Sequence, residues 1–293
     1  MLELDRVVRA ADRRVATAIR KVRARRSAPV EQVDIQLRST VGYQIAAKAH
    51  RVRGTSGRQP AVLLCPGIHD PGDSFSRWLS PITAAEVARL GCTVLTFDPA
   101  GRGKSWGEED YGGPEHQDNV KVALAHLASR TDVDPNRIGI VAISLGVAMA
   151  VGAAAQPDVP SVSWLLDWEG PSDREIITVA GTIMTPAAGH TLEDEVYWKP
   201  REAVRHVAGL RCAYVRLQGA RDHAQPDEIR HARRMMRAVS TPASAVRWFQ
   251  LNDHPRGIAP DRPSWLPSEH LAMNRIMLRK IATLTRESAK PRA

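Results

Sequence analysis

Short apolar runs alternate with segments of helical periodicity along most of this chain. Apolar runs of this length, bounded by turn residues, are typical of strands buried on both faces of a sheet. They occur at residues 61–65, 92–97, 138–143, 162–168, 212–219 and 245–251. Because strands that alternate with helices form mostly parallel sheets, the pattern predicts an α/β fold whose central sheet has helices on both faces.

Other segments complete this fold prediction. Val33, Ile35 and Leu37 alternate with polar residues, and residues 43–50 follow a short Gly-containing connection, so we expect an antiparallel pair of strands there. Helices are expected at residues 75–90 (with Pro81 in the first turn), 114–129, 227–239 and 267–286. Residues 171–200 have weak periodicity and are interpreted as a small insertion before the strand predicted at 212–219, a lid of the kind that commonly covers a site.

The net charge of +9 is concentrated near the N-terminus. Residues 1–28 hold nine Lys or Arg and three acidic residues, and apolar side chains recur at steps of three and four over residues 2–26. This pattern predicts a basic amphipathic helix at residues 1–28, followed by one α/β domain at 29–293. The helix lacks the aromatic residues of membrane anchors and nucleic-acid sites. We therefore expect it to contact the main domain, a second copy or a partner, with no nucleic-acid partner.

Cysteine content and hydropathy indicate the cellular location expected for this chain. No run is apolar enough to predict a membrane span, and no secretory signal is recognised, so a cytoplasmic location is expected. The three cysteines, Cys65, Cys92 and Cys212, lie in apolar runs, and their odd number argues against a disulfide framework. We expect buried free thiols.

Residues 138–154 run from an apolar strand through Ser144 into an Ala-rich helix. A residue on so sharp a strand-to-helix turn takes a strained conformation, which requires small residues two positions before and after it. Ala142 and Gly146 stand there, with Ala142 in place of the first Gly of the G-x-S-x-G pattern. Ser144 is therefore a candidate nucleophile; the alternative is a small residue in a tight turn.

A serine nucleophile needs a histidine to accept its proton and usually a carboxylate to orient that histidine. In a parallel sheet both should follow the carboxyl ends of later strands. Asp222 follows the run that ends at Gly219, and His254 follows the last run. We predict a Ser144, Asp222, His254 triad. The alternatives are Asp167 and Glu169 for the acid and His223, His231 and His270 for the base.

With these residues in place, the chain resembles the α/β-hydrolase superfamily over about residues 30–288. The resemblance is carried by A-x-S-x-G at 142–146, by the turn Asp98-Pro-Ala-Gly-Arg-Gly-Lys-Ser105, by Gly219-Ala-Arg-Asp222 with Pro226, and by His254. It implies an oxyanion hole formed by the backbone N–H groups of Leu145 and Ile68. The Cys-Pro-Gly sequence before Ile68 departs from the family's frequent His-Gly, which leaves the position of the second donor open by about one residue.

One part of the Asp98 turn, Gly103-Lys104-Ser105, looks like the end of a phosphate-binding P-loop. That motif requires a Gly five positions before Gly103, where this chain has Asp98. A P-loop is therefore excluded.

The resemblance implies a serine hydrolase that cleaves a carboxylic ester or a related small-molecule acyl substrate through an acyl-enzyme, with no cofactor and no metal. Alternatives are an amide, peptide or C–C bond hydrolase with the same triad, and a non-catalytic binding protein of the same fold. His69, Trp168, Trp198 and His223 are candidates for the substrate pocket. Core packing for the tryptophans and loop hydrogen bonding for His69 are the alternative roles.

Overall fold

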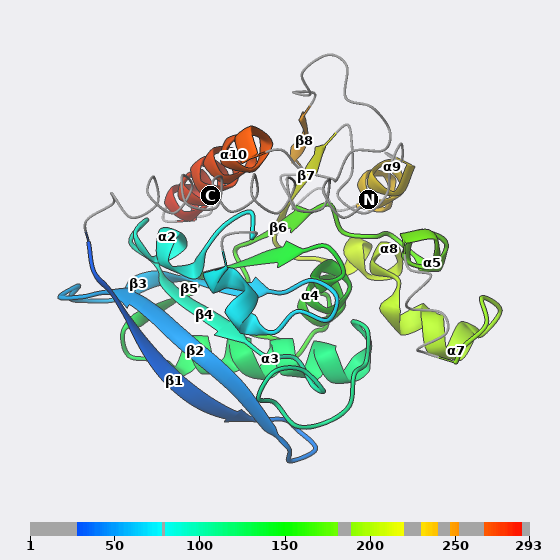
Figure 1. Cartoon of the computed structure of the whole chain (residues 1–293), viewed down its shortest axis with the longest axis horizontal. Coiled ribbons are helices and arrows are strands. Elements are labelled where there is room, and N and C mark those ends of the chain that lie inside the picture. Colours follow the sequence, from blue (N-terminus) through cyan, green and yellow to red (C-terminus); the bar gives the residue numbers. More distant parts are fainter. Residues whose placement is uncertain are drawn as a thin grey trace, which may run out of the picture.

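The computed structural model describes residues 28–77, 80–180, 189–219, 230–239, 247–251 and 267–288, of which 178–180, 247–251 and 267–272 are described by their backbone alone. The helix predicted at residues 2–26 lies outside the described residues, so the division of the chain near residue 28 stays a prediction. Within the described ranges, eight strands form one sheet in the order β1-β2-β4-β3-β5-β6-β7-β8 (Figure 1).

The strands match the predicted runs, except that β5 begins five residues before the run predicted at 138–143. Their bounds are β1 Val30–Arg38, β2 Gln44–Val52, β3 Gln59–Cys65, β4 Thr93–Phe97, β5 Val133–Ile143, β6 Trp164–Trp168, β7 Ala213–Gly219 and β8 Arg247–Leu251. β2 is antiparallel to β1 and to β4, whereas all pairings from β4 through β3 to β8 are parallel. The predicted antiparallel pair and the mostly parallel sheet are both confirmed.

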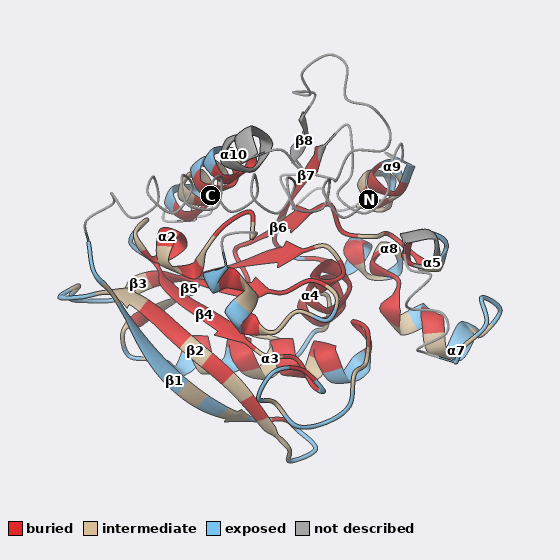
Figure 2. Ribbon diagram, viewed as in Figure 1, coloured by how far each residue is buried: buried red, intermediate tan, exposed pale blue. Residues whose placement is uncertain are grey.

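Helices lie on both faces of the sheet, as predicted. Their bounds are α2 Ala84–Ala88, α3 Pro114–Ser129, α4 Gly146–Ala154, α5 Arg174–Ala180, α7 Glu195–Trp198, α8 Ala203–His206, α9 Arg230–Ala238 and α10 Pro267–Glu287, with 3-10 turns η1 Gly72–Ser76, η2 Lys199–Arg201 and η3 Val207–Gly209. One apolar core joins the sheet to α3, α4, α8 and α9, and a second joins the opposite face to α2 and α10. The central strands are accordingly buried, while β1 is largely exposed (Figure 2).

The prediction of a mainly helical segment at residues 75–90 is wrong. Within its described residues the chain forms the end of η1 and the short helix α2, and Pro81 precedes α2 rather than starting it. The reason is the capping box at Thr83: its side chain accepts a hydrogen bond from the N–H of Glu86, and the Glu86 carboxylate accepts one from the Thr83 N–H at 2.9 Å. These reciprocal bonds satisfy the free N–H groups of a helix that begins at Ala84.

The segment between β6 and β7 contains α5, α7 and α8, and ion pairs connect these helices to one another and to α9. The Arg174 guanidinium pairs with Glu202 at 2.7 Å and with Glu195 at 2.8 Å, so α5 is joined to α7 and α8. Arg234 of α9 pairs with Asp173 at 2.8 Å. These pairs connect the segment to the helices beside the sheet, and its role as a cover of the site stays a prediction.

Several titratable groups are buried in the core. All three cysteines are free and buried, as predicted, and burial raises the pKa of the Cys92 thiol to about 11. His50 of β2 is 1% exposed and contacts the Thr96 hydroxyl on β4 through Nε2 at 3.2 Å. Burial, with a smaller contribution from the Lys48 charge, lowers the pKa of His50 to about 4.

We expect His50 to make the stability of this protein depend on pH. In the unfolded chain a histidine takes up a proton near pH 6.5, whereas folded His50 stays neutral down to about pH 4. The unfolded state therefore binds more protons in this interval, and the free energy of unfolding falls as the pH is lowered through it, by about 3 kcal/mol from this group.

Denaturant unfolding of the wild type and of His50→Gln at several pH values checks this expectation. The variant keeps a polar side chain that does not titrate, so its free energy of unfolding should fall about 3 kcal/mol less between pH 6.5 and 4. Parallel curves for the two proteins would contradict the assignment.

Candidate active site

Ser144 lies where β5 ends and the chain turns into α4. Its φ of 53° is in the left-handed region, which a residue other than Gly adopts only when its surroundings hold it there. The Ser144 N–H donates to the carbonyl of Trp168 at the end of β6 at 2.9 Å, and the Ser144 carbonyl accepts from the N–H of Val147 at 3.0 Å. The strained strand-to-helix turn expected from the sequence is therefore present, at the carboxyl edge of the parallel strands.

The small residues that flank Ser144 have a clear steric reason. A Cβ atom added to Gly146 would lie 2.4 Å from the carbonyl oxygen of Pro66 and 2.7 Å from that of Cys65. The start of α4 thus packs directly on the turn that follows β3. Ala142 is fully buried between its register partners Cys65 on β3 and Asp167 on β6. A methyl group fits at position 142, whereas position 146 has no room for one.

The same close packing brings the turn after β3 beside the nucleophile. A Cβ atom built on Gly67 would lie 3.5 Å from the Ser144 Cβ. Ile68 is half-buried, and its side chain packs against the cluster that contains Leu145. Within the described part of the chain, neither the Leu145 N–H nor the Ile68 N–H donates a hydrogen bond. The two predicted oxyanion donors therefore lie on the two segments that meet at Ser144.

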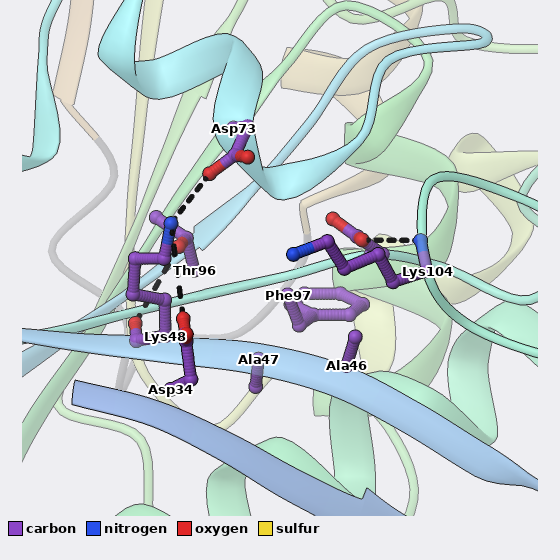
Figure 3. Close-up of a pocket in the computed structure, with 9 residues that line it drawn as sticks. Asp34, Ala46, Ala47, Lys48, Asp73, Thr96, Phe97 and Lys104 are labelled. Atoms are coloured by element: carbon purple, nitrogen blue, oxygen red, sulfur yellow. Dashed lines mark hydrogen bonds and ion pairs between the residues drawn. The ribbon is translucent and has the colours of Figure 1, made fainter.

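The Asp98–Ser105 motif is a closed turn. Asp98 accepts hydrogen bonds from the N–H of Gly72 through Oδ1 and from the N–H of Lys104 through Oδ2, both at 2.8 Å. The Ser105 hydroxyl donates to the Asp98 carbonyl at 2.5 Å. Figure 3 shows the hollow beside this turn, where the Lys48 ammonium pairs with Asp73 at 3.0 Å. The carboxylate of Asp98 fills the inside of the turn, so the motif has a structural role.

Asp167, one alternative acid, is held inside the sheet. Its side chain and that of Arg216 are both fully buried and pair at 2.6 Å. The Tyr214 hydroxyl donates to the same carboxylate oxygen as Arg216, and the Gly170 N–H donates to the other at 2.9 Å. Burial raises the pKa of Tyr214 well above its ordinary value, which keeps the phenol protonated as a donor. Asp167 is therefore committed to a structural network.

Glu169, the other alternative acid, follows the end of β6. It directly follows Trp168, whose carbonyl bonds the Ser144 N–H, and its N–H donates to the carbonyl of Leu217 at 3.1 Å. Its φ of 51° is again in the left-handed region. A strained carboxylate residue therefore lies at the same edge of the sheet as Ser144, with 1% of its surface exposed.

The remaining acid and base candidates fall on different parts of the chain. Asp222, His223 and His254 lie outside the described residues, and His270 is described by its backbone in α10. His231 of α9 is buried, and its Nδ1 lies 3.1 Å from the Gly170 carbonyl and 3.2 Å from the Arg216 guanidinium. His231 thus belongs to the same buried network as Asp167.

The described candidates for the substrate pocket differ in exposure: His69 is exposed, whereas Trp168 and Trp198 are buried. His69 is exposed on the turn after β3, with a φ of 56°, and its ring meets that of Tyr111 edge-on at 5.7 Å. Trp168 is 5% exposed at the end of β6. Trp198 is fully buried, packs in one cluster with Leu145 and Tyr111, and donates its Nε1–H to the Thr191 carbonyl at 2.7 Å. Trp198 therefore packs against the start of α4 as part of the core.

The structure also brings Arg102 to this site. Its guanidinium donates to the Gly67 carbonyl at 2.6 Å, and to both carboxylate oxygens of Glu109 at 2.6 and 2.7 Å. No sequence signal predicts the first contact, because Gly67 and Arg102 are 35 positions apart and follow different strands. The Asp98–Ser105 motif marks the turn that carries Arg102 but not the direction of its side chain.

We expect Gly146→Ala to destabilise the fold by about 3 kcal/mol, because the new methyl group would overlap the backbone at Pro66. Gly54→Ala is the matched control: Gly54 has a φ of 77° but nothing within 4 Å, so only backbone strain of about 1 kcal/mol is added. Urea unfolding of both variants compares the two losses. A loss in Gly146→Ala no greater than in Gly54→Ala would show that the close approach is absent.

Within the described residues, no group of three or more His, Cys, Asp or Glu is arranged to hold a metal ion. Among the described helices, none combines the length and the apolar character needed to cross a bilayer.

Comparison with known sequences gives partial matches. No family model matches the chain. Two uncharacterized proteins of Mycobacterium tuberculosis, from two strains, are each 37% identical over 102 residues, which is 35% of this chain and 34% of each relative. The alpha/beta hydrolase UcsC of an Acremonium species is 33% identical over 113 residues, 36% of this chain and 22% of that protein. The matches thus span about a third or less of the length of these relatives.

Solved structures match over most of the chain. Esterase Pf2001 of Pyrococcus furiosus is 14% identical and superposes with a TM-score of 0.63 over 88% of this chain and 92% of its own. A puromycin-hydrolyzing peptidase of Mycobacterium tuberculosis is 15% identical, with a TM-score of 0.67 over 88% of this chain and 39% of its own. At these identities the likeness shows the fold alone. Together with the sheet order and the turn at Ser144, it shows that this chain has the α/β-hydrolase fold.

Proposed function

We propose that this protein is a serine hydrolase that cleaves a carboxylic ester or a related acyl substrate. The observation that carries the proposal is the left-handed conformation of Ser144 at a strand-to-helix turn, held by hydrogen bonds from two elements. Such strain persists only where the surrounding structure holds it, and it is concentrated at functional sites. A buried structural serine needs no such conformation.

In the proposed reaction, the Ser144 hydroxyl oxygen attacks the substrate carbonyl while His254 accepts the hydroxyl proton. Asp222 orients His254 and stabilises its cationic form. The tetrahedral intermediate expels its leaving group, which takes the proton from His254, and an acyl-enzyme forms. Water then attacks the acyl-enzyme with His254 again as the base, which releases the acid and restores Ser144.

The backbone geometry supports the proposed oxyanion hole. Leu145 is the N-cap residue of α4, so its N–H lies at the helix end that carries a partial positive charge. Gly67 lies beside Ser144, and the following N–H belongs to Ile68. Two N–H groups that bond no other described residue are suited to stabilise a developing oxyanion, which is commonly worth a factor of about 100 to 1,000 in rate for each donor.

Amide or peptide cleavage is a second candidate, because the superposed structures include a peptidase that hydrolyses puromycin as well as an esterase. Both reactions share the steps up to departure of the leaving group, so the described site fits both. Initial rates on an ester and an amide that share one acyl group distinguish them. The hydrolase proposal is preferred to a purely binding role because a binding surface does not require the strain at Ser144.

Ser144→Ala should abolish hydrolysis of activated esters such as p-nitrophenyl acetate, and also labelling by a fluorophosphonate probe, because both require the serine oxygen. Ser129→Ala is the control: Ser129 is exposed at the end of α3, where its hydroxyl bonds the His126 carbonyl. This variant should be labelled like the wild type. Labelling that survives in folded Ser144→Ala would rule out Ser144 as the nucleophile.

Asp222→Asn should lower kcat by about 10,000-fold, because an amide cannot stabilise the cationic form of His254. Glu169→Gln tests the alternative acid, and we expect its kcat to stay within about threefold of the wild type. Steady-state kinetics on one ester decide the assignment. The reverse pattern would move the acid to the end of β6.

A further inference from the structure

Arg102 is a buried cation beside the proposed oxyanion turn. Its side chain is 2% exposed, although it comes from the turn between β4 and α3. Glu109 accepts from its Nε at 2.6 Å and from its Nη2 at 2.7 Å, a two-point contact that fixes the plane of the guanidinium. Its Nη1 donates to the Gly67 carbonyl at 2.6 Å and, at 3.4 Å, to the Asp70 carbonyl.

The Gly67 carbonyl and the Ile68 N–H belong to one peptide unit. A peptide unit is planar and trans, so its C=O and N–H bonds point in opposite directions. A donor that fixes the direction of the Gly67 carbonyl therefore fixes the direction of the Ile68 N–H as well. A cation on that oxygen also polarises the amide, which makes the N–H a stronger donor.

We propose that Arg102 is a positioning residue for the oxyanion hole, which aims and strengthens the Ile68 N–H by bonding the Gly67 carbonyl. This inference rests on the proposed hydrolase function. It also identifies Ile68 as the residue of this turn that supplies the second oxyanion donor. Arg102 bonds the Gly67 carbonyl at 2.6 Å, and the N–H of that peptide unit belongs to Ile68.

The other proposed donor is fixed in a different way. The peptide unit that carries the Leu145 N–H has the Ser144 carbonyl at its other end, and that oxygen accepts from the Val147 N–H at 3.0 Å. The first turn of α4 thus holds one donor with backbone alone. The turn after β3 runs into no regular helix at Ile68, so a side chain performs the same task there.

Glu109 compensates the charge of the buried Arg102 guanidinium. A charged guanidinium with 2% exposure would be strongly destabilising without a partner. Burial would raise the pKa of Glu109, but its hydrogen bonds and charge contact with Arg102 outweigh this effect and hold the pKa below its ordinary value. The Tyr111 N–H also donates to Glu109 at 2.9 Å. The carboxylate is therefore ionised and fixed, which fixes the guanidinium in turn.

Arg51 offers a matched control at the opposite edge of the sheet. Its guanidinium also bonds a carboxylate, that of Asp132 at 2.9 Å, and a backbone carbonyl, that of Gly57 at 3.0 Å. Gly57 precedes β3, whereas Gly67 follows it. Arg51→Met thus removes the same kinds of contact as Arg102→Met without touching the turn beside Ser144.

The first measurement needs no substrate. The backbone amide resonance of Ile68 in ¹H–¹⁵N spectra of the whole chain should shift in Arg102→Met, because the carbonyl of its peptide unit loses the hydrogen bond from the guanidinium. In Arg51→Met this resonance should keep its wild-type position. An unchanged Ile68 resonance in folded Arg102→Met would overturn the proposal, because Arg102 would then not hold the Gly67 carbonyl.

The second measurement separates positioning from general stability. Arg102→Met should lower kcat for an activated ester by about 10- to 100-fold with KM within about threefold, because the oxyanion forms only in the transition state. Arg51→Met should keep the wild-type kcat after correction for the folded fraction. Equal losses in both variants, or a change in KM alone, would overturn the proposal.

Two further outcomes keep the test decisive. If Arg102→Met does not fold, Arg102→Lys takes its place; it retains a cation but cannot make the two-point contact with Glu109, and a smaller loss of kcat in the same direction is expected. If the wild type hydrolyses no ester and takes no fluorophosphonate label, the proposed function has failed and the catalytic part of this inference fails with it. The Ile68 amide resonance still decides whether Arg102 holds this peptide unit.

Discussion

The close approach of α4 to the turn after β3 is the constraint on which the site depends. β3 and β5 are neighbours in the sheet, with Cys65 opposite Ala142, so their carboxyl ends emerge together. Gly146 then sits against the carbonyl oxygens of Cys65 and Pro66, a distance that no side chain allows. Because of this contact, the strained Ser144 and the Gly67 turn lie side by side. A slightly wider spacing would separate the nucleophile from one proposed oxyanion donor.

A buried ion pair lies on the strands beside this contact. Asp167 and Arg216 are fully buried between β6 and β7 and share further bonds with Tyr214 and Gly170. Breaking such a pair by removing one partner typically costs about 3–5 kcal/mol, because the other charge stays buried. The network therefore fixes the geometry where β6 ends, at Trp168, whose carbonyl accepts the hydrogen bond from the Ser144 N–H. It also explains why Asp167, despite its position, is not the acid we propose.

Periodicity and motif spacing predicted most of the fold but only part of the site. Strands buried on both faces are visible as apolar runs, and Ser144 with Gly146 follows from a steric rule that operates within five residues. The prediction of a helix at 75–90 is wrong because it does not use the Thr83-x-x-Glu86 capping signal, which marks the start of α2 at Ala84. The contact of Arg102 with Gly67 depends on the direction of one side chain between two loops, which no local pattern contains.

The turn after β4 acts as a brace for the turn after β3. Asp98 bonds the Gly72 N–H, while Arg102, four residues later, bonds the Gly67 carbonyl, so one turn holds both ends of residues 67–72. Gly101 and Gly103 adopt left-handed conformations, and a Cβ on Gly103 would lie 2.2 Å from the Asp98 carboxylate. These glycines therefore allow Asp98 to close the turn from which Arg102 reaches across. The motif that first suggests a phosphate loop therefore supports the turn after β3, and on the proposed function it holds one donor of the proposed oxyanion hole.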